Sequence, residues 1–237
     1  EVPKIFLQIK IDGGNFLEDN KRIGLSQITA ELMNESTDNY TSEEMDKELS
    51  KLGSEISFSS SGGSTTIFVS SLTKNIDKTL SLLEEKLFKP DFNDEDLKRV
   101  KKQFIEALNA QEKDANHLAQ SRFKKLMYGE TPMGIEANEK TINKIKMKHV
   151  QSFYNNNYSP SVSNITVVGD ISSDELLSKL NFLSNWKSKK VDVPSDFAFP
   201  EDQETQIYIV DKPGATQSVI FMGHKSNKYD VDGQFFK

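Results

Sequence analysis

The sequence has no cysteine and only three histidines in 237 residues. Without cysteine there is no disulfide, no thiolate zinc site, no iron–sulfur cluster and no cysteine nucleophile. The histidines stand at positions 117, 149 and 224, too far apart for a pair on one helical turn. Long apolar runs are lacking too, since stretches such as Ile5-Phe6-Leu7 fall far below the roughly 18 residues of a membrane-spanning helix. The sequence therefore predicts neither a membrane span nor one of the common metal sites.

Arginine is scarce. Only three of the 30 basic residues are arginine, and 36 acidic residues bring the net charge to −6. A nucleic-acid interface needs a basic face with arginine side chains for phosphates and base edges. The pairs Lys101-Lys102 and Lys124-Lys125 lie in predicted helices with acidic neighbours, and we interpret them as solvated helix faces. No nucleic acid is expected among the partners.

The strands are predicted from alternation and turn signals. Apolar side chains alternate in residues 5–11, and Asp12-Gly13-Gly14 ends this run as a turn, because it lacks the Lys-Ser/Thr of a phosphate loop. Residues 54–60 and 65–72 form a predicted hairpin around Ser61-Gly62-Gly63-Ser64, and a further strand covers 163–168.

Helical spacing of apolar residues predicts the other elements. A capping box, Thr41-Ser-Glu-Glu44, starts one helix, which Gly53 ends. The predicted helices are 20–36, 41–52, 76–87, 93–112, one that begins near Asn116, 138–144, 146–156 and 173–185. Strands and helices thus cluster separately, which predicts an α+β fold with an antiparallel-rich sheet and helices packed on one side.

The length allows one domain and part of a second. Residues 1–185 are predicted as a complete α+β repeat, and 186–204 as a linker rich in Lys, Ser, Asp and Pro. Residues 205–237 are predicted as the start of a second, truncated repeat, with strands at 206–211 and 217–222 and the approach to a helix at 229–236. The chain also begins without a methionine or a signal segment, so we interpret it as a piece of a longer protein.

Several short stretches occur along the chain in an order typical of one family. They are Asp12-Gly13-Gly14, Gly24-Leu25-Ser26-Gln27, Leu52-Gly53, Lys89-Pro90-Asp91-Phe92, Phe153-Tyr154 with Asn157-Tyr158-Ser159-Pro160, Val167-Val168-Gly169-Asp170, and Lys212-Pro213-Gly214-Ala215. In this order the chain resembles the insulinase/pitrilysin (M16) zinc metallopeptidases and their non-catalytic partners. The resemblance implies the M16/LuxS-like metallohydrolase fold, with one complete repeat and the start of a second.

The resemblance also implies where a zinc site would lie. Active members carry an inverted motif, His-x-x-Glu-His, on the first helix, and a further Glu on a later helix. These positions correspond here to Gln27, Ala30 and Glu31, and the later Glu to Ala107, with the neighbouring Glu106 as an alternative if the register slips by one. None of the motif residues is kept, so we expect no catalytic residue and no metal in this chain, and zinc in a catalytic partner domain.

The family's peptide-binding strand also departs from its pattern. Its usual Asn-Ala pair is replaced by Ser57-Phe58, which are the candidate substrate-binding residues on an edge strand that pairs with an extended peptide.

Three functions follow from the resemblance. The first is a non-catalytic domain that helps to enclose and position an unfolded peptide beside a catalytic M16 half, in the same chain or in a partner. The second is a structural or assembly module, like the family's respiratory-complex core subunits, and the third is an active hydrolase with a shifted site. The compartment stays open, with the bacterial periplasm or cell envelope favoured because the family's stand-alone bacterial members are often exported.

Other conspicuous residues have simpler interpretations. Glu31 and Glu35 stand four apart, and surface charge explains them better than a carboxylate metal pair. The three histidines are expected to be structural, with His117 after an asparagine cap and His149 on a lysine-rich helix face. Four aromatic residues flank or lie in the linker, and we expect them to pack on the domain and not to form an exposed binding patch: Phe182, Trp186, Phe197 and Phe199.

Overall fold

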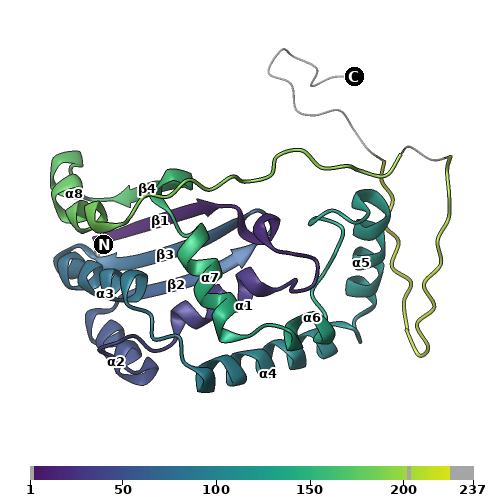
Figure 1. The fold of residues 1–237 in the computed structure, drawn as a ribbon, viewed down its shortest axis with the longest axis horizontal. Helices are drawn as coiled ribbons and strands as arrows, with labels where there is room; N and C mark the ends of the chain where they lie inside the picture. The colour runs from purple at the N-terminus through teal and green to yellow at the C-terminus, as the bar shows by residue number, and fades with distance from the viewer. Residues whose placement is uncertain (1–2, 202–203, 225–237) are drawn as a thin grey trace, which may run out of the picture. The chain divides into compact units, whose positions relative to one another are not determined.

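The computed structural model describes residues 3–201 and 204–224 (Figure 1). The chain forms two compact units. The first contains residues 1–106 and 137–195, and the second contains residues 107–136 and 196–237. Among the described residues, no helix is long and apolar enough to cross a membrane.

The first unit is built on a four-stranded sheet in the order β2-β3-β1-β4. Its strands are β1 (Lys4–Asp12), β2 (Glu55–Ser61), β3 (Ser64–Leu72) and β4 (Ser163–Gly169). Every neighbouring pair is antiparallel, with Ile9 of β1 opposite Ile67 of β3 and Ile165 of β4. β2 and β4 are therefore the two edges of the sheet.

One face of this sheet forms the core. On β1 the side chains of Ile5, Leu7 and Ile9 are buried, whereas Phe6, on the opposite face, is 41% exposed. Figure 1 shows helices in front of the strands, and α1 packs on β2 while α3 packs on β3. The predicted α+β fold with helices on one side of an antiparallel sheet is confirmed.

The helices follow the predicted order. They are α1 (Leu25–Asn34), α2 (Ser42–Leu52), α3 (Ile76–Phe88), α4 (Asp94–Gln111), α5 (Ala115–Tyr128), α6 (Glu139–Asn143), α7 (Met147–Asn157) and α8 (Ser173–Lys179). Short 3-10 turns lie at Gly14–Leu17 (η1), Thr73–Asn75 (η2), Pro160–Val162 (η3) and Leu180–Asn185 (η4). The predicted capping box at Thr41 and Glu44 is present, and the left-handed Gly53 ends α2.

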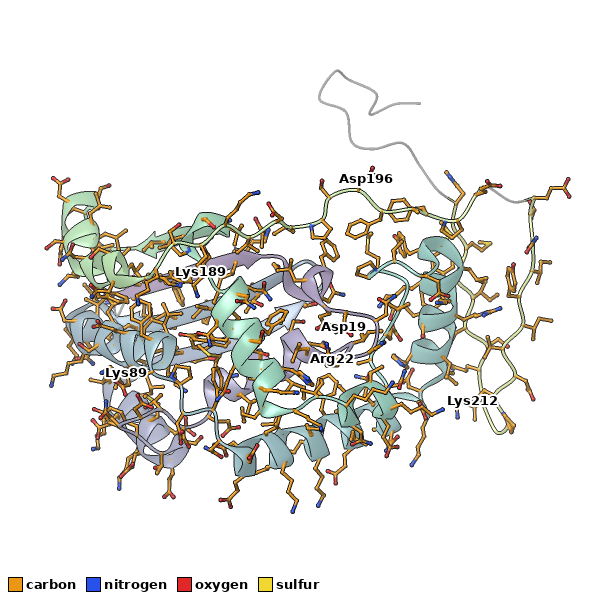
Figure 2. The ribbon with its side chains drawn as sticks, in the orientation of Figure 1. Asp19, Arg22, Lys89, Lys189, Asp196 and Lys212 are labelled. Carbon is orange, nitrogen blue, oxygen red and sulfur yellow. The ribbon has the colours of Figure 1, made fainter. Side chains whose placement is uncertain are left out.

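The helix predicted over 20–36 begins later, at Leu25. The reason lies in the loop before it, where the side chain of Glu18 folds over the helix start and accepts hydrogen bonds from the backbone N–H groups of Gly24 (2.9 Å) and Ser26 (2.6 Å). These bonds satisfy N–H groups that the first turn of a helix leaves without a partner. Asp19 and Arg22 form an ion pair in the same loop, and Figure 2 labels both.

The second unit differs more from the sequence expectations. Its helix α5 is capped by Asp114, whose carboxylate accepts from the backbone N–H of His117 at 2.9 Å, so the predicted asparagine cap is wrong. A carboxylate serves well there because it is negatively charged at the positive end of the helix dipole.

The strands predicted at 206–211 and 217–222 are also wrong, because residues 204–224 form no helix or strand. Alternating apolar residues form a stable strand only beside a partner strand, and none pairs with them in the described part of the second unit. Ile207 and Ile209 are accordingly 88% and 89% exposed. The predicted helix approach at 229–236 lies outside the described residues, and the domain division at 185 and 205 stays a prediction.

Two of the four aromatic residues after α8 pack on the first unit as expected. Phe182 and Trp186 each meet the ring of Phe88 edge-on, and the Trp186 indole donates to the backbone carbonyl of Tyr158 at 3.3 Å. In the second unit Phe197 contacts Phe199, but Phe199 is 44% exposed, so the expectation of packing is wrong for Phe199.

The start of α1 gives a first testable prediction. Replacing Glu18 with alanine removes two hydrogen bonds to the first turn, and we expect the free energy of unfolding to fall by about 1–2 kcal/mol in urea titrations. Glu18→Gln keeps a side-chain carbonyl oxygen and is expected to lose less. Equal midpoints for the alanine variant and the wild type would show that Glu18 does not set the start of α1.

Candidate functional site

Helix α1 carries the three positions that the resemblance assigns to the zinc motif. Gln27, Ala30 and Glu31 share one helical face, because residues three and four apart are neighbours on a helix. Gln27 is half-buried, Ala30 is 0% exposed and Glu31 is exposed. The face therefore offers one amide, one methyl group and one carboxylate.

This set does not fit the zinc ion of the family. A catalytic zinc needs about three nitrogen, sulfur or carboxylate ligands together with a water, and a base to accept the water's proton. Gln27 is a neutral amide and Ala30 has no group that accepts a proton. Within residues 3–201 and 204–224, no cluster of three or more His, Cys, Asp or Glu side chains is placed to hold a metal.

The interpretation of Glu31 and Glu35 as surface charges on a helix holds for Glu31 but is wrong for Glu35, which follows the last residue of α1 and has a side chain that is 16% exposed. Glu35 forms an ion pair with Arg99 of α4, with 2.5 Å between the carboxylate oxygen and the guanidinium nitrogen. Partial burial raises the pKa of Glu31, a hydrogen bond with Asn34 lowers it, and the charge of Glu35 adds to the rise. Glu35 is thus paired with an arginine, and in the described part of the chain Glu31 belongs to no cluster of three or more metal-binding side chains.

The C-terminal end of α1 is fixed by a buried lysine. Lys86 of α3 is 1% exposed, and its ammonium group donates to the backbone carbonyl of Asn34, the last residue of α1, at 2.7 Å. The last carbonyls of a helix have no partner inside the helix and carry its negative dipole end. Burial lowers the pKa of Lys86 to about 8, although the charges of Asp46 and Glu35 work in the opposite direction.

The side chain of the same Asn34 binds the edge strand β2. Its Nδ2 donates to the backbone carbonyl of Phe58 at 2.9 Å, and the backbone N–H of Phe58 donates to its Oδ1 at 2.8 Å. Both backbone groups of Phe58 that face away from β3 are therefore occupied. Pairing of a peptide at Ser57-Phe58 stays a prediction, and it requires this carboxamide to move.

Glu106 and Ala107 lie on α4 with different surroundings. Glu106 is on the side of α4 that faces Lys102, 3.9 Å away, and its side chain is 64% exposed. It lines a groove of about 500 Å³ with Lys98, Lys101 and Asn143, which holds none of the positions 27, 30 and 31. Ala107 is exposed and begins the second unit. Both residues are exposed, so Ala107 stays the predicted family position and Glu106 the alternative.

The histidines have local partners. His149 accepts a hydrogen bond from the backbone N–H of Lys146 through Nδ1, at 3.1 Å, and so helps to start α7. His117 lies 3.9 Å from the carboxylate of Glu136. His224 is an exposed residue in the second unit. The first two contacts agree with structural roles.

Lys86 and Asn34, which hold the end of α1, were not predicted from the sequence. For Lys86 a signal existed, because it stands three and four residues after Leu83 and Leu82 in the apolar stripe of α3, where a surface lysine is not expected. For Asn34 there was none, since Phe58 is 24 residues away and the contact uses only the backbone of Phe58.

The lysine gives a prediction for the pH dependence of stability. Between pH 8 and 10.5 the unfolded chain binds more protons at Lys86 than the folded chain does, so the free energy of unfolding should rise with pH in this window. Relative to Lys86→Met, which has no titrating group, the wild type should gain at most about 3 kcal/mol. Urea titrations at several pH values measure this difference.

Lys89→Met is the matched control on the same helix. The hydrogen bond with Glu85 raises the pKa of Lys89 above its ordinary 10.5, so the contribution of Lys89 should stay nearly constant between pH 8 and 10 and fall only above about pH 10.5, unlike that of Lys86. Figure 2 labels Lys89 at the end of α3. A difference between wild type and Lys86→Met that does not change with pH would contradict the buried ammonium.

A second prediction concerns metal binding. By calorimetry, the wild type should show no stoichiometric zinc binding, whereas Gln27→His with Glu31→His places two imidazoles four residues apart and should bind zinc. Ala30→Glu is left out, because it would bury a carboxylate at a fully buried position. Adding Ala107→Glu should tighten binding if the predicted register holds, while adding Glu106→Ala should not change it. Tight zinc binding by the wild type would contradict the degenerate site.

Two models of one family match successive parts of the chain. The model of the insulinase family (peptidase family M16) matches residues 3–141, and the model described as the peptidase M16 inactive domain matches residues 144–234. The non-peptidase homolog YmxG of Helicobacter pylori is 25% identical over 187 residues, which are 78% of this chain and 43% of that protein. An uncharacterized zinc protease of Rickettsia felis is 20% identical over 70% of this chain and 40% of its own length. The chain thus spans less than half the length of these two curated relatives.

Solved structures show the same fold. A peptidase M16 inactive domain from Pseudomonas fluorescens has a TM-score of 0.74 at 21% identity, over 82% of this chain and 48% of that one. The periplasmic protease PqqL from Escherichia coli has a TM-score of 0.71 at 18% identity, over 81% of this chain and 23% of that one. With a family model that matches more than half of its residues, the chain belongs to the insulinase family, peptidase family M16.

Proposed function

We propose that this chain is a non-catalytic domain of an M16-type zinc protease, which helps to enclose and position a peptide beside a catalytic half in the same protein or in a partner. The observation that carries the proposal is the face of α1, where Gln27, Ala30 and Glu31 stand in place of two zinc ligands and a general base. Without a base at position 30, a metal that bound by chance would still lack its proton acceptor. The zinc is accordingly assigned to the catalytic half.

The comparisons support the proposal in two ways. The inactive-domain model covers residues 144–234, and one relative is described as a non-peptidase homolog. The chain also covers less than half of its curated relatives, so a second half of comparable size is expected in the functional protein. A domain that has lost its metal ligands keeps the shape of the fold, which is what enclosure of a substrate requires.

A structural or assembly role is the second candidate. The contact between Asn34 and Phe58 favours it, because it occupies the outer edge of β2 on which a substrate strand would pair. An assembly module needs its folded surface and does not need an open strand edge. The two candidates differ in their effect on a catalytic partner's turnover.

The test measures cleavage of quenched fluorogenic peptides by the full-length protein, in which any intact His-x-x-Glu-His motif outside this chain carries a Glu→Gln substitution. We expect no cleavage that a chelator abolishes. When the substituted protein is mixed with an unmodified catalytic M16 half from the same organism, the kcat/KM of that half should rise at least about tenfold. This corresponds to about 1.4 kcal/mol of transition-state stabilisation.

Two results would count against the proposal. Chelator-sensitive cleavage by the substituted protein would show that this chain is itself catalytic. A stable complex that leaves the kcat/KM of the catalytic half unchanged would favour the assembly role. Gln27→Ala serves as the control in both cases, because a degenerate position should tolerate it without a change in either readout.

A further inference from the structure

The outer edge of β2 is occupied by a side chain of the same molecule. β2 is an edge strand, and in an antiparallel pair the backbone groups of successive residues face the neighbouring strand and the free edge in turn. Phe58 belongs to the outward set, since its N–H and its C=O both bond the side chain of Asn34. By the same alternation Ile56 and Ser60 face outward too. In the described part of the chain, the backbone groups of these two residues make no hydrogen bond outside the sheet.

The carboxamide of Asn34 has the hydrogen-bonding groups of a peptide unit. It carries one carbonyl acceptor and N–H donors in a single plane. In an antiparallel sheet a residue of the next strand would exchange the same two bonds with Phe58, one in each direction. The observed lengths, 2.8 Å and 2.9 Å, are those of ordinary backbone bonds. Asn34 therefore takes the place of one residue of an added strand.

The backbone of Asn34 is held in position, so only its side chain is free to leave. The ammonium of Lys86 binds its carbonyl at 2.7 Å, and the next residue, Glu35, is paired with Arg99. Rotation of the Asn34 side chain would free both backbone groups of Phe58. It would break the two hydrogen bonds to Phe58 and the one to Glu31.

We propose that Asn34 is a gate on the outer edge of β2, which competes with an extended peptide for the backbone of Phe58. The partner is a peptide in strand conformation, recognised through its main chain along Ile56, Phe58 and Ser60. The gate rests on the contact between Asn34 and Phe58 and not on the non-catalytic role. Even if the chain does not stimulate a catalytic half, Asn34 should still compete with a peptide for Phe58.

The experiment compares peptide binding by the wild type and by Asn34→Ala. The probe is a fluorescent nine-residue peptide of alternating Thr and Val with lysines at both ends, measured by fluorescence anisotropy. Asn34→Ala should bind it at least about tenfold more tightly than the wild type, because the two bonds to Phe58 no longer have to be broken first. The same peptide with N-methyl groups on alternate backbone nitrogens should lose this gain, since it cannot donate to a strand edge.

Asn75→Ala is the matched control. The Nδ2 of Asn75 donates to the carbonyl of Leu52 at 2.7 Å, so this variant also loses a side-chain bond to the backbone, but away from the outer edge of β2. It should bind the peptide no better than the wild type. Hydrogen exchange adds a direct readout, because the Phe58 amide should exchange faster in Asn34→Ala and slow again when the peptide is bound.

Asn34→Asp provides a second variant if the alanine variant does not fold. It keeps an acceptor for the Phe58 N–H and loses the donor for the Phe58 carbonyl, so its affinity for the peptide should lie between those of wild type and Asn34→Ala. Equal affinity of the wild type and a folded gate variant, including no binding by either, would overturn the proposal. So would a gain that the N-methylated peptide retains.

Discussion

The position of the first helix depends on how its last residue is held. Asn34 is the last residue of α1, and its carbonyl, its side chain and the residue after it are each bound by a different element. Lys86 comes from α3, Phe58 from β2, and Arg99, which pairs with Glu35, from α4. A helix held at one end by three elements has little freedom to slide or turn about its axis. The direction in which Gln27 and Glu31 point is fixed by this arrangement, whatever their chemistry.

A buried lysine is an uncommon way to hold a helix end, and its energetics explain the low pKa. Removing an ammonium group from water costs several kcal/mol, which one hydrogen bond to a carbonyl does not offset in full. The helix dipole supplies part of the difference, since the C-terminal carbonyls of α1 carry partial negative charge where Lys86 binds. The remaining imbalance favours the neutral amine, so the pKa of Lys86 falls toward 8. The net stabilisation is therefore small, and the contact contributes chiefly by fixing where the two helices meet.

Local patterns were enough to predict most of the elements, but they did not locate the contacts that join them. The alternation in 5–11 predicted β1, and the box at Thr41 and Glu44 predicted the start of α2, because both signals lie within a few residues of what they specify. The start of α1 is set by Glu18, which stands six and eight residues before the two N–H groups that it binds. A capping pattern does not reach that far along the sequence. The prediction of a strand over 206–211 was wrong for the converse reason. Alternating apolar residues form a strand only where a neighbouring strand is available for pairing.

For the candidate site, the family resemblance indicated the positions and the structure gave the environment. That Gln27, Ala30 and Glu31 stand at the motif positions is what the resemblance implies. The structure was needed to show that Glu106 faces Lys102 and that the Asn34 side chain binds the backbone of Phe58. The first depends on a helix face and the second on a contact between distant segments. Side chains that bind a backbone leave no sequence pattern in their partner, so such contacts are the ones that sequence analysis overlooks most easily.

The loss of the zinc motif and the occupied strand edge belong to the same helix, and they are compatible for a physical reason. A catalytic zinc centre needs about three protein ligands, a bound water and space for a substrate. In this chain Ala30 is buried, and Asn34, four residues further on the same helical face, spans the distance from α1 to β2 by itself. A side chain that bridges helix and strand would stand in the way of a peptide pairing at Phe58. Asn34 joins α1 to β2 directly, and of the three outward-facing residues of β2 only Phe58 has its backbone groups satisfied in this way.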